Sequence, residues 1–532
     1  MISIQKGNYN MKRSQLETEI NKRKTFAIIS HPDAGKTTLT EKILFLSGAI
    51  RSAGTVKSRK SEKFATSDWM EMEKQRGISI TSSVMQFTYD GYNINILDTP
   101  GHQDFSEDTY RTLMAVDSVV MIIDAAKGVE AQTKKLFKVC SDRGIPIFTF
   151  INKMDRQGRD PYELLEDIEE VLGIQSFPMN WPIGMGTTFQ GVYDRNGHKI
   201  HLYNEQKEHQ TYTLENEDFT SHTLKELIDP DQLFELQETI SLLNEAGDSM
   251  DLEAIKQGKQ TPVFFGSAIS SFGIPAFMEH FLELAPEPQG RESNNGYIAP
   301  SELDFSGIVF KIQANMNPAH RDRIAFMRIC SGTFKKGMDA WNDRTQKSVK
   351  LAQGQQFFAA SRGNIDEAYP GDIVGLYDPG LYQIGDTLCG TKDTFSYGKL
   401  PQFPPEHFAK VRAKNAMKQK HFYKGVAQLS EEGAIQVYKT AAMEETIIGV
   451  VGVLQFEVFE SRLKNEYGVV LEIQPLPHTC ARWISNDQSL KIESTNYKAY
   501  DQQGNPLIIF ENDFALRWFQ NKNPDIELYE KR

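Results

Sequence analysis

Short apolar runs, each carrying β-branched residues, alternate with helix-forming stretches between Thr25 and Ile151. Four of these runs end where the chain turns polar, and they read TFAIIS, YNINILD, SVVMIID and IPIFTFIN. Near-continuous apolar strands separated by helices predict a parallel β-sheet that is covered on both faces. Ligands of such sheets bind at the carboxyl ends of the strands, so we expect function in the polar residues that follow these runs.

The pattern changes after a proline-rich segment at residues 285–300, APEPQGRESNNGYIAP. Strand-like runs such as FSGIVFKI, RIAFMRIC and GDIVGLYD follow, with glycine-centred turns such as SGTFKKG between them. Closely spaced short strands with turn signals predict a β-barrel. A second proline-rich segment, KLPQFPPEH, opens the last third of the chain.

The last third predicts the order strand, helix, strand, strand, helix, strand, which is a ferredoxin-like α+β arrangement. The expected strands are 407–413, 434–438, 446–451 and 469–473, and the expected helices are 415–430 and 453–467. One stripe of the second helix carries Phe456, Phe459, Leu463 and Tyr467, which we expect in the core. The pattern predicts no element after about residue 478.

The first 24 residues contain no apolar segment long enough for a signal peptide, so we expect a cytoplasmic protein. Met11 opens an amphipathic pattern, and residues 1–10 would then be an extension or an alternative start. The most apolar early run, at residues 118–123, is far too short to span a bilayer, so no membrane association is expected.

The chain has 532 residues, with 59 basic and 71 acidic side chains and a net charge of −12, which by itself argues against a nucleic-acid partner. The acid is concentrated, however, because residues 161–260 carry 20 acidic and 6 basic residues, or −14, and leave +2 for the rest. The composition, 39% hydrophobic, is that of globular domains. The four cysteines form no CxxC pair, which gives no support for a zinc cluster or a disulfide framework and favours a reducing compartment.

A phosphate-binding pattern, SHPDAGKT, follows the first strand and precedes the helical run TLTEKILFL. Backbone N–H groups of such a loop and the helix N-terminus bind phosphate oxygens. Gly35 permits close approach, Lys36 would reach the β- and γ-phosphates, and the Thr37 hydroxyl would ligate Mg²⁺. The expected nucleotide contacts are Ser30, which stands where the general pattern has Gly, with His31, Pro32, Asp33, Ala34, Gly35, Lys36, Thr37 and Thr38. Taken alone, Gly35 and Lys36 also fit an ordinary helix start.

The second motif, DTPGH, ends another of the predicted strands. Asp98 at that strand end can hold a metal ion through water, and the Gly101 N–H can sense a γ-phosphate. His102 would stand beside that phosphate, where it could orient the attacking water as the catalytic residue. The expected nucleotide contacts here are Asp98, Thr99, Pro100, Gly101 and His102. A hydrogen-bonded structural histidine is the alternative for His102.

The third motif, NKMD, is the strongest specificity signal in the chain. The Asp155 carboxylate can accept from guanine N1–H and from its exocyclic amine, and adenine would leave it unpaired, a difference of about 10⁴-fold. Asn152 would tie this loop to the phosphate loop and Lys153 would lie along the base. The expected contacts are Asn152, Lys153, Met154 and Asp155, with Ser267 and Ala268 after the strand TPVFF. An ordinary polar turn is the alternative, but three motifs in order at strand ends favour a GTP/GDP site.

Residues 64–83, FATSDWMEMEKQRGISITSS, resemble the first switch of translational GTPases, in which the RGIT motif supplies a threonine ligand to Mg²⁺. Ser79 stands in that position, so the resemblance implies Ser79 as the ligand; it keeps the hydroxyl and lacks the methyl group. A basic stretch precedes this segment and fits either a functional surface or an ordinary solvated face. It contains Arg51, Lys57, Arg59, Lys60 and Lys63.

With these motifs, the acidic segment, the barrel with SGTFKKGM and the βαββαβ end, the chain closely resembles the peptide chain release factor 3 family. These bacterial class II release factors are translational GTPases related to elongation factor G. The likeness runs from about Met11 to at least Pro477, and its most specific pieces are SHPDAGKTTLTEKIL, FATSDWMEMEKQRGISITSS and FSGIVFKIQANMNPAHRDRIAFMRICSGTF.

The resemblance implies a ribosome-stimulated GTPase that binds the ribosome after peptide release, ejects the class I release factor and leaves upon GTP hydrolysis. The chain contains no Gly-Gly pair, so it lacks the GGQ tripeptide of class I factors and should not cleave peptidyl-tRNA. It leaves no room for the two further domains of elongation factor G. Another ribosome-associated GTPase, translocase-like or recovering ribosomes, and a non-hydrolysing GTP sensor remain the alternatives.

The fold class expected on this resemblance is an α/β P-loop GTPase domain with an acidic insertion, then a β-barrel domain, then a C-terminal α+β ferredoxin-like domain. The expected boundaries are 1–24 for an N-terminal extension or helix, 25–290 for the GTP-binding domain with its insertion at about 161–260, 300–395 for the barrel and 401–532 for the C-terminal domain. The expected partners are the ribosome, through rRNA and ribosomal proteins, and class I release factors, with the chain acting as a monomer.

An RNA-facing surface is expected in residues 401–425, where six basic residues oppose one acidic residue. The basic residues are Lys410, Arg412, Lys414, Lys418, Lys420 and Lys424. The interleaved aromatic residues fit a domain core better than a stacking platform, and an ordinary solvated helix is the alternative for the whole segment.

Overall fold

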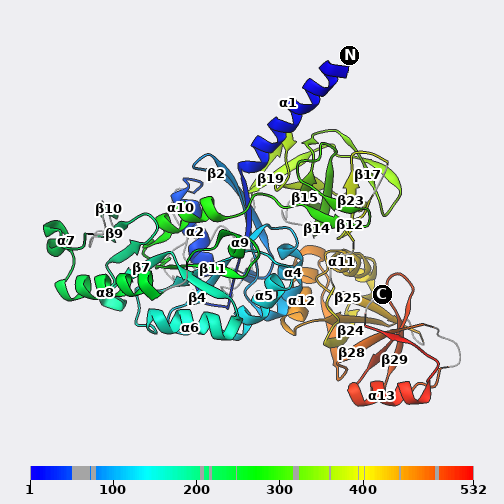
Figure 1. Cartoon of the computed structure of the whole chain (residues 1–532). Coiled ribbons are helices and arrows are strands. Elements are labelled where there is room, and N and C mark those ends of the chain that lie inside the picture. The colour runs from blue at the N-terminus through cyan, green and yellow to red at the C-terminus, as the bar shows by residue number, and fades with distance from the viewer. Residues whose placement is uncertain are drawn as a thin grey trace.

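The computed structural model shows three structured bodies along the chain, and a helix at the N-terminus that projects away from them (Figure 1). It describes residues 2–50, 72–73, 79–203, 209–214, 218–246, 249–314, 323–358, 361–392, 395–398, 400, 402–441, 445–485 and 490–530.

The first body is an α/β domain whose parallel strands lie in the order β3-β1-β4-β5-β11-β6. Their bounds are β1 Arg23–Ser30, β3 Tyr92–Asp98, β4 Ser118–Asp124, β5 Ile147–Asn152, β6 Gln175–Pro178 and β11 Gln260–Phe265. The covering helices are α2 Lys36–Leu46, α4 Ser106–Leu113, α5 Ala131–Ser141, α6 Pro161–Leu172 and α10 Ile274–Leu284. The predicted doubly covered parallel sheet is confirmed.

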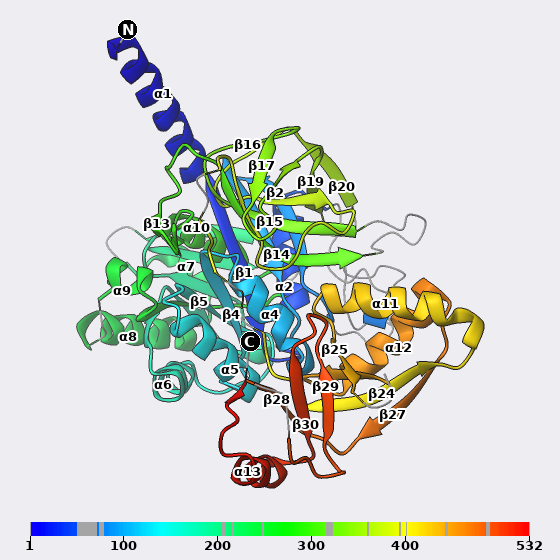
Figure 2. The same cartoon turned by 90° about the vertical axis from the view of Figure 1, so that its right-hand side faces the viewer.

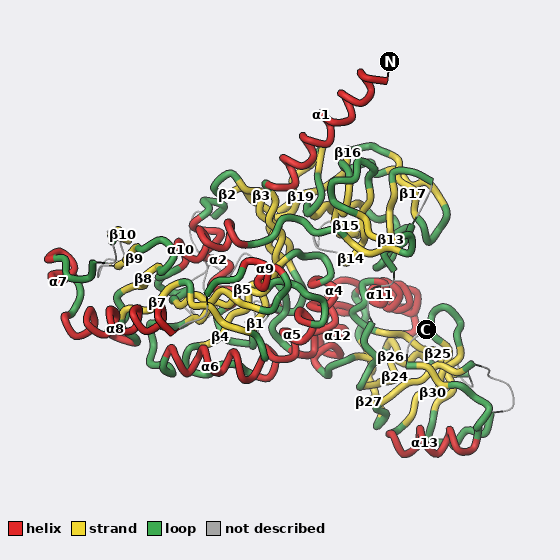
Figure 3. The backbone as a smooth tube through the Cα atoms, in the orientation of Figure 1, coloured by secondary structure: helices red, strands yellow, loops and turns green. Residues whose placement is uncertain are grey.

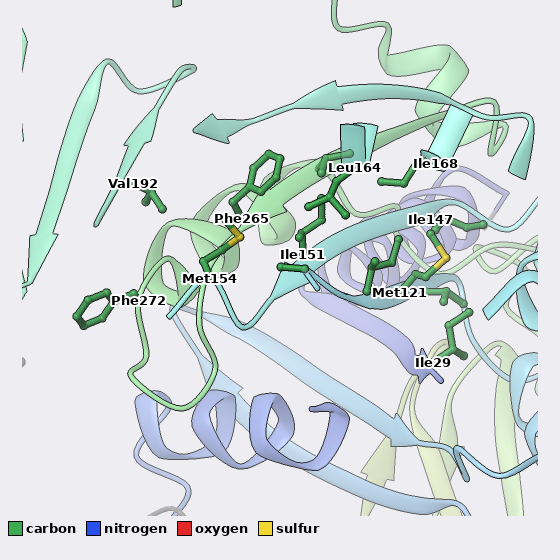
Figure 4. Packing of buried hydrophobic residues seen from close by; sticks show 14 of the residues in the cluster. Ile29, Met121, Ile147, Ile151, Met154, Leu164, Ile168, Val192, Phe265 and Phe272 are labelled. Carbon is green, nitrogen blue, oxygen red and sulfur yellow. The ribbon is translucent and has the colours of Figure 1, made fainter. Parts of the chain in front are cut away.

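Two hydrophobic clusters cover the two faces of this sheet because successive strand residues point to opposite sides. Helices α2 and α10 pack on the face that carries Phe26 and Val120. Helices α4, α5 and α6 pack on the other face, which carries Ile29 and Met121. Figure 4 shows part of this second cluster, where residues of β1, β4 and β5 meet residues of α6. Both faces of the sheet are therefore buried under helices.

A separate antiparallel sheet, which we call the inserted sheet, lies beside the α/β domain in the order β10-β9-β8-β7. Its bounds are β7 Asn180–Ile183, β8 Gly191–Asp194, β9 Lys199–Tyr203 and β10 His209–Thr213, and it is followed by α7 His222–Leu227, α8 Pro230–Ala246 and α9 Leu252–Lys256. The expected insertion at residues 161–260 needs correction, because α6 and β6 belong to the α/β domain. Charge follows the surface, so an acidic segment need not coincide with a folding unit.

The second body is antiparallel and continues the sheet of the first. Its strands are β14 Ser306–Ala314, β15 Arg323–Ser331, β16 Phe334–Lys335, β17 Asp339–Asn342, β18 Lys347–Lys350, β19 Gly354–Phe358, β20 Ser361–Ile365, β21 Glu367–Ala368, β22 Ile373–Tyr377 and β23 Thr387–Cys389. A hairpin of β12 Arg291–Ser293 and β13 Gly296–Ile298 precedes them. We call residues 305–390 the barrel, in line with the predicted fold class.

The barrel is joined to the α/β domain by backbone pairing and by a buried ion pair. Strand β19 pairs with β2, Ser83–Tyr89, which itself pairs with β3. Arg328 donates to both carboxylate oxygens of Asp117 at 2.7 and 2.8 Å, and both side chains are buried. Removal of either partner would leave the other charge buried and unpaired, which would destabilise the contact between the two bodies by several kcal/mol.

The third body, the C-terminal domain from residue 407, contains the predicted βαββαβ arrangement. Its elements are β24 His407–Ala413, α11 Gln419–Glu431, β25 Gln436–Thr440, β26 Thr446–Val450, α12 Leu454–Tyr467 and β27 Leu471–Leu476. The predicted core stripe is confirmed, because Phe459, Leu463 and Tyr467 are buried and Phe456 packs against them. Figure 2 shows α11 and α12 side by side on this sheet.

The final segment, for which the sequence predicted no element, extends the same sheet. Its elements are β28 Cys480–Ile484, β29 Tyr497–Tyr500, β30 Pro506–Phe510, α13 Asp513–Lys522 and β31 Leu528–Tyr529, and the full order is β27-β24-β26-β25-β29-β30-β28-β31. Figure 3 shows the strands grouped against helix α13 on their outer side. β29 pairs with β25, and the other strands of this segment extend the sheet from β29, so their pairing partners and not their short sequences define them.

Helix α1 spans Ile2–Asn21, so the helix begins before Met11, where the amphipathic pattern placed its start. Arg23, the first residue of β1, donates to Asp372 of the barrel at 2.7 Å. Among the helices of the described residues, none combines the length and the apolar character that a membrane crossing requires.

Candidate nucleotide-binding site

The three predicted motifs meet at one edge of the α/β sheet, where the parallel strands end. Ile28 of β1 lies opposite Asp98 of β3, and Asp124 of β4 lies opposite Asn152 of β5. The loops that follow these strands therefore leave the sheet at the same edge. This is the position at which sheets of this class bind ligands.

The phosphate loop turns tightly from β1 into α2. Gly35, which precedes α2, has φ +103°, and a Cβ there would lie 2.2 Å from Asn152 Nδ2, so only glycine fits. Asn152 Nδ2 donates to the Ala34 carbonyl at 2.8 Å, which is the expected tie between the third motif and this loop. Asp33 has φ +67°, a conformation that aspartate tolerates better than most residues. The loop thus has the backbone shape of an anion cradle at a helix N-terminus.

Lys36 and Asp98 converge at the base of this cradle. Lys36 Nζ donates to Asp98 Oδ1 at 2.5 Å, and both side chains are buried. Thr99 Oγ1 donates to the Ile28 carbonyl at 2.7 Å and holds the end of β3 against β1. An ammonium group and a carboxylate at one point suit a phosphate and a hydrated cation, respectively.

His102 uses one side of its ring for structure. Its Nδ1 accepts from the Asp104 N–H at 3.2 Å and caps the 3₁₀ helix η1, Gln103–Phe105. The side chain remains 30% exposed, and the described residues give Nε2 no hydrogen bond. The structural role and the expected water-orienting role of His102 therefore use opposite nitrogens, so neither excludes the other.

Asp104 links this motif to the C-terminal domain, and the sequence analysis did not single it out. Asp104 Oδ2 accepts from the Leu454 N–H at 2.8 Å, at the N-terminus of α12. Gly452 must be glycine here, because a Cβ would lie 2.1 Å from the Asp104 carboxyl carbon. The only sequence signal was an acidic residue two positions after the histidine. A residue beside the phosphate end of the site thus caps a helix of another domain.

A small hydrophobic cluster lies next to this cap. Ile80, Phe105 and Val458 are buried together, with Met72 and Leu454 packed against them. A cavity of about 60 Å³ adjoins this cluster and is bordered by the α/β domain, the barrel and the C-terminal domain. Among the described residues, the contact between the predicted first switch and the C-terminal domain is therefore incompletely filled.

The described part of the predicted first switch is held by carboxylates. Glu73 accepts from the N–H groups of Ile80 and Thr81 at 2.9 and 3.1 Å. Ser79, the metal ligand that the resemblance implies, directly precedes Ile80 in the chain. Its role as a ligand stays a prediction. The basic stretch at residues 51–63 lies outside the described residues.

Asp108 connects the end of this switch to the barrel. It accepts from Ser82 N–H and Oγ at 2.6 and 2.7 Å, and Lys311 Nζ of the barrel lies 3.2 Å away. Burial alone would raise the pKa of Asp108, but Lys311, Arg111 and the Ser82 hydrogen bonds hold that pKa below its ordinary value. The carboxylate is thus ionised and fixes the segment that leads into β2.

The third motif forms a closed network with the loop after β11. Asn152 Oδ1 accepts from the Lys153 and Ala268 N–H groups, both at 2.8 Å. Ser267 Oγ donates to Asp155 Oδ1 at 2.5 Å, and the Met154 N–H donates to Gly266 O. The structure therefore brings the predicted base-contacting residues together from two loops that lie 112 residues apart.

Lys153 is fixed by two acceptors, one of which the sequence analysis missed. Lys153 Nζ donates to the Asp33 carbonyl at 2.6 Å and to Asp124 Oδ2 at 2.7 Å. Asp124 ends the predicted strand SVVMIID, so its position at a strand end was the available signal. The lysine stem thereby spans from the third motif to the phosphate loop, as a lysine lying along a base would.

Within the part of the chain that the structure describes, no group of three or more His, Cys, Asp or Glu side chains is arranged to hold a metal ion. A cation would thus depend on hydroxyl groups, on Asp98 and on the phosphates themselves, which is how Mg²⁺ is commonly bound beside nucleotides.

Two of the basic residues in the predicted RNA-facing surface form ion pairs within the protein. Lys410 pairs with Glu445 at 2.7 Å, and Arg412 forms a two-bond pair with Glu472. Lys414, Lys420 and Lys424 are exposed, and the structure records no ion pair for them among the described residues. Phe408 and Phe422 are buried, which confirms for these two residues the prediction of a domain core, but Tyr423 is 48% exposed, so the prediction is wrong for Tyr423.

Three family models match consecutive parts of the chain. The Elongation factor Tu GTP binding domain matches residues 21–287, Elongation factor G domain 2 matches residues 304–391, and the Class II release factor RF3, C-terminal domain, matches residues 397–520. These ranges together cover the α/β domain, the barrel and most of the C-terminal domain.

Relatives of known name match over nearly the full length. The peptide chain release factor 3 of Listeria monocytogenes serotype 4b (strain CLIP80459) is 59% identical over 517 residues, which cover 96% of this chain and 98% of the relative. Those of Streptococcus sanguinis (strain SK36) and Staphylococcus saprophyticus subsp. saprophyticus are 56% and 55% identical, each over 97% of this chain and 99% of the relative.

A solved structure from Thermus thermophilus shares the fold. It has a TM-score of 0.70 and 22% sequence identity, and the match covers 90% of this chain and 72% of that one. At this identity the likeness concerns the arrangement of the domains and not their activity.

Proposed function

This chain belongs to the peptide chain release factor 3 family, and from that membership we propose the function of the molecule and of its site. The protein is a translational GTPase of termination, and it promotes the dissociation of class I peptide release factors from the ribosome after peptide release. The observation that carries this conclusion is 59% identity across 98% of a relative of that name. The match to the release-factor C-terminal domain favours termination over a translocase-like role.

Guanine nucleotides bind at the edge of the α/β sheet described above. In our proposal the phosphate loop, residues 30–38, and the residues 98–102 contact the phosphates, with Lys36 on the β- and γ-phosphates. The Asp155 carboxylate accepts from the N1–H and the exocyclic amine of guanine, and the loop that carries Ser267 and Ala268 also contacts the base. The closed hydrogen-bond network of the third motif supports this assignment.

We assign a Mg²⁺ ion to the hydroxyl groups of Thr37 and Ser79, with Asp98 acting through water. The ion would neutralise charge on the β- and γ-phosphates. The Lys36–Asp98 contact supports this proposal, because it places the carboxylate directly beside the start of the helix that carries Thr37.

Hydrolysis in this proposal depends on His102 orienting the attacking water. Intrinsic turnover is slow, and a partner can accelerate GTP hydrolysis by about 10⁵-fold, which corresponds to about 7 kcal/mol of barrier. The ribosome supplies this activation. The histidine already has its Nδ1 occupied by the Asp104 N–H, which leaves Nε2 as the nitrogen that faces the reaction.

The ribosome is contacted by exposed basic residues of the C-terminal domain, of which Lys414, Lys420 and Lys424 are the best placed for rRNA phosphates. The acidic inserted segment would face a protein or solvent. We further propose that the protein acts as a monomer in the cytoplasm and, because the sequence contains no Gly-Gly pair, that it does not hydrolyse peptidyl-tRNA.

The test follows a fluorescently labelled class I release factor as it leaves post-release ribosomes. The protein is added with GTP, with GDP or without nucleotide, and the dissociation rate is recorded. We expect acceleration that depends on GTP. Equal rates under all three conditions would remove the termination function.

A further inference from the structure

We infer that Tyr203, in the inserted sheet, is a positioning residue for guanine recognition. It holds the loop of residues 266–273, which carries Ser267 and Ala268, in the shape that fixes the Asp155 carboxylate. The inference rests on the base contacts proposed above and adds to them a residue outside the nucleotide motifs.

The Tyr203 hydroxyl binds the end of this loop directly. Its oxygen accepts from the Gly273 N–H at 3.0 Å. Gly273 has φ +79° and stands immediately before α10, and a Cβ there would lie 2.6 Å from the Phe265 carbonyl oxygen. Because only glycine fits this position, Tyr203 binds the loop at a point of restricted backbone shape, immediately before α10.

The Tyr203 ring also packs on Phe272, the residue before Gly273. Its centroid lies 3.9 Å from that of Phe272, with 11° between the ring planes, and Phe189 contacts Phe272 at 5.5 Å. Phe272 is 8% exposed. Burial raises the pKa of Tyr203 to about 12, so the phenol is neutral and suits this apolar contact. The tyrosine thus fixes both Phe272 and Gly273.

From Phe272 a short path of hydrogen bonds leads to the base site. The Phe272 carbonyl accepts from the Ser267 N–H at 2.9 Å, and Ser267 Oγ donates to Asp155 Oδ1 at 2.5 Å. A Cβ on Gly266 would lie 2.5 Å from the Phe272 carbonyl oxygen, so the loop closes tightly on itself. A shift of Phe272 would therefore move Ser267 and, with it, the carboxylate that selects guanine.

A second contact shows that the inserted sheet holds the following helix as well. His280 of α10 lies 2.9 Å from Asp194 Oδ1 of β8, and both side chains are buried. The sheet therefore contacts α10 before its first turn and in its second, and the loop of residues 266–273 is held between β11 and this buttress.

The test compares GDP with IDP, which lacks the exocyclic amine. In Tyr203→Phe the stack on Phe272 remains and the hydrogen bond to Gly273 is lost, so we expect GDP to bind roughly threefold to tenfold more weakly. IDP offers the Asp155 carboxylate one donor instead of two, so its affinity should fall less and the GDP/IDP affinity ratio should decrease. Dissociation constants come from competition against a fluorescent guanine nucleotide.

Tyr212→Phe is the matched control. It removes the same hydroxyl from the neighbouring strand β10, where the hydroxyl donates to Gln210 Oε1 at 2.7 Å and, among the described residues, has no recorded hydrogen bond to the loop of residues 266–273. Its GDP/IDP ratio should equal that of the unchanged protein. Phe272→Leu, which keeps an apolar side chain and loses the stack, should lower the ratio as Tyr203→Phe does.

Asp155→Asn, measured in the same assay, separates the inference from the function on which it rests. If Asp155→Asn lowers the ratio and Tyr203→Phe does not, the base contacts stand and the role of Tyr203 is overturned. Equal loss of GDP and IDP affinity in Tyr203→Phe also overturns it, because that is the result of general destabilisation. An unchanged ratio in Asp155→Asn overturns both the base assignment and the inference.

Discussion

The base end and the phosphate end of the proposed nucleotide site contact different parts of the chain. The base end, Asn152, Asp155 and Ser267, forms a closed hydrogen-bond network that the inserted sheet buttresses through the loop after β11. The phosphate end, by contrast, is tied to other domains: Asp104 caps α12 of the C-terminal domain, and Asp108 pairs with Lys311 of the barrel.

This difference suggests a division of roles: the base end would bind the nucleotide, and the phosphate end would distinguish GTP from GDP. GTP and GDP share one base, so the proposed base end should bind both alike. Only the γ-phosphate distinguishes them, and its proposed contacts lie in the segment that reaches the C-terminal domain. A change at the phosphate end can therefore alter domain contacts without altering the base site.

The largest expected effect is on GTP turnover, when His102 at the phosphate end is replaced and the base end is left intact. His102→Ala should lower ribosome-stimulated GTP turnover by up to about 10⁵-fold, because the water loses the group that orients it. Phosphate release with post-termination ribosomes measures this turnover. GDP affinity, measured on the same preparation, should not change, and turnover that survives the substitution would make His102 a purely structural histidine.

The next effect addresses the base end alone. Asp155→Asn exchanges an acceptor for a donor, so affinity for GTP and GDP should fall equally, by about 10⁴-fold, and preference should move toward xanthine nucleotides. A competition assay with both bases measures the shift. Guanine selectivity that persists would remove Asp155 from the base site, and unequal losses of GTP and GDP would contradict a base end that ignores the γ-phosphate.

A smaller effect concerns the contact between Asp104 and the C-terminal domain. Asp104→Ala removes the acceptor of the Leu454 N–H, so hydrogen exchange at that amide should accelerate by about 10- to 100-fold, the value of a bond to a charged group. Peptide-resolved exchange measures it, with GDP affinity unchanged. Asp251→Ala is the control, because Asp251 also caps a helix, α9, but lies away from this contact; unchanged exchange in Asp104→Ala would show that the cap does not hold α12.

The smallest effect is a pH dependence in the buttress of the base end. Burial, and then the neighbouring His209, lower the pKa of His201 from 6.5 to about 4, so His201 is neutral in the folded protein. The unfolded chain binds this proton first, so the contribution of His201 to stability is complete above pH 6.5 and is lost as the pH falls toward about 4. Asp194 and Glu279 oppose this shift, while Lys199 supports it.

The measurement is the melting temperature at neutral pH and near pH 5 for the unchanged protein and for His201→Gln. The variant should lose less stability on acidification. His280 acts with the opposite sign: burial lowers its pKa, but the Asp194 carboxylate raises it overall, so its contribution is lost as the pH rises. An equal loss in both proteins would show that His201 does not titrate in this way.

Local patterns predicted the elements that carry the nucleotide motifs. The strands that end at Asp98 and Asn152, and the βαββαβ order near the C-terminus, follow from apolar periodicity and turn residues over short windows. The grouping of the three motifs follows because parallel strands end at one edge. The roles of the individual site residues and the domain boundaries, apart from the corrected insertion, stay predictions.

Contacts between distant segments were not predictable from the sequence. Asp104 and Leu454 are 350 residues apart, and the hydrogen bond between Tyr203 and Gly273 joins segments 70 residues apart. Neither pair has a local signature, because each residue is ordinary in its own element. The strands after residue 478 were missed for a similar reason, since pairing defines them and not their own periodicity: β29 pairs with β25, β30 with β29, and β28 with β30 and β31.

The most direct test of this account combines the base site with the release of a class I factor. Asp155→Asn is added to post-release ribosomes that carry the labelled factor, with GTP or with xanthosine triphosphate. The account predicts that xanthosine triphosphate restores factor dissociation and that GTP at the same concentration does not. Dissociation driven by GTP and not by xanthosine triphosphate would contradict it.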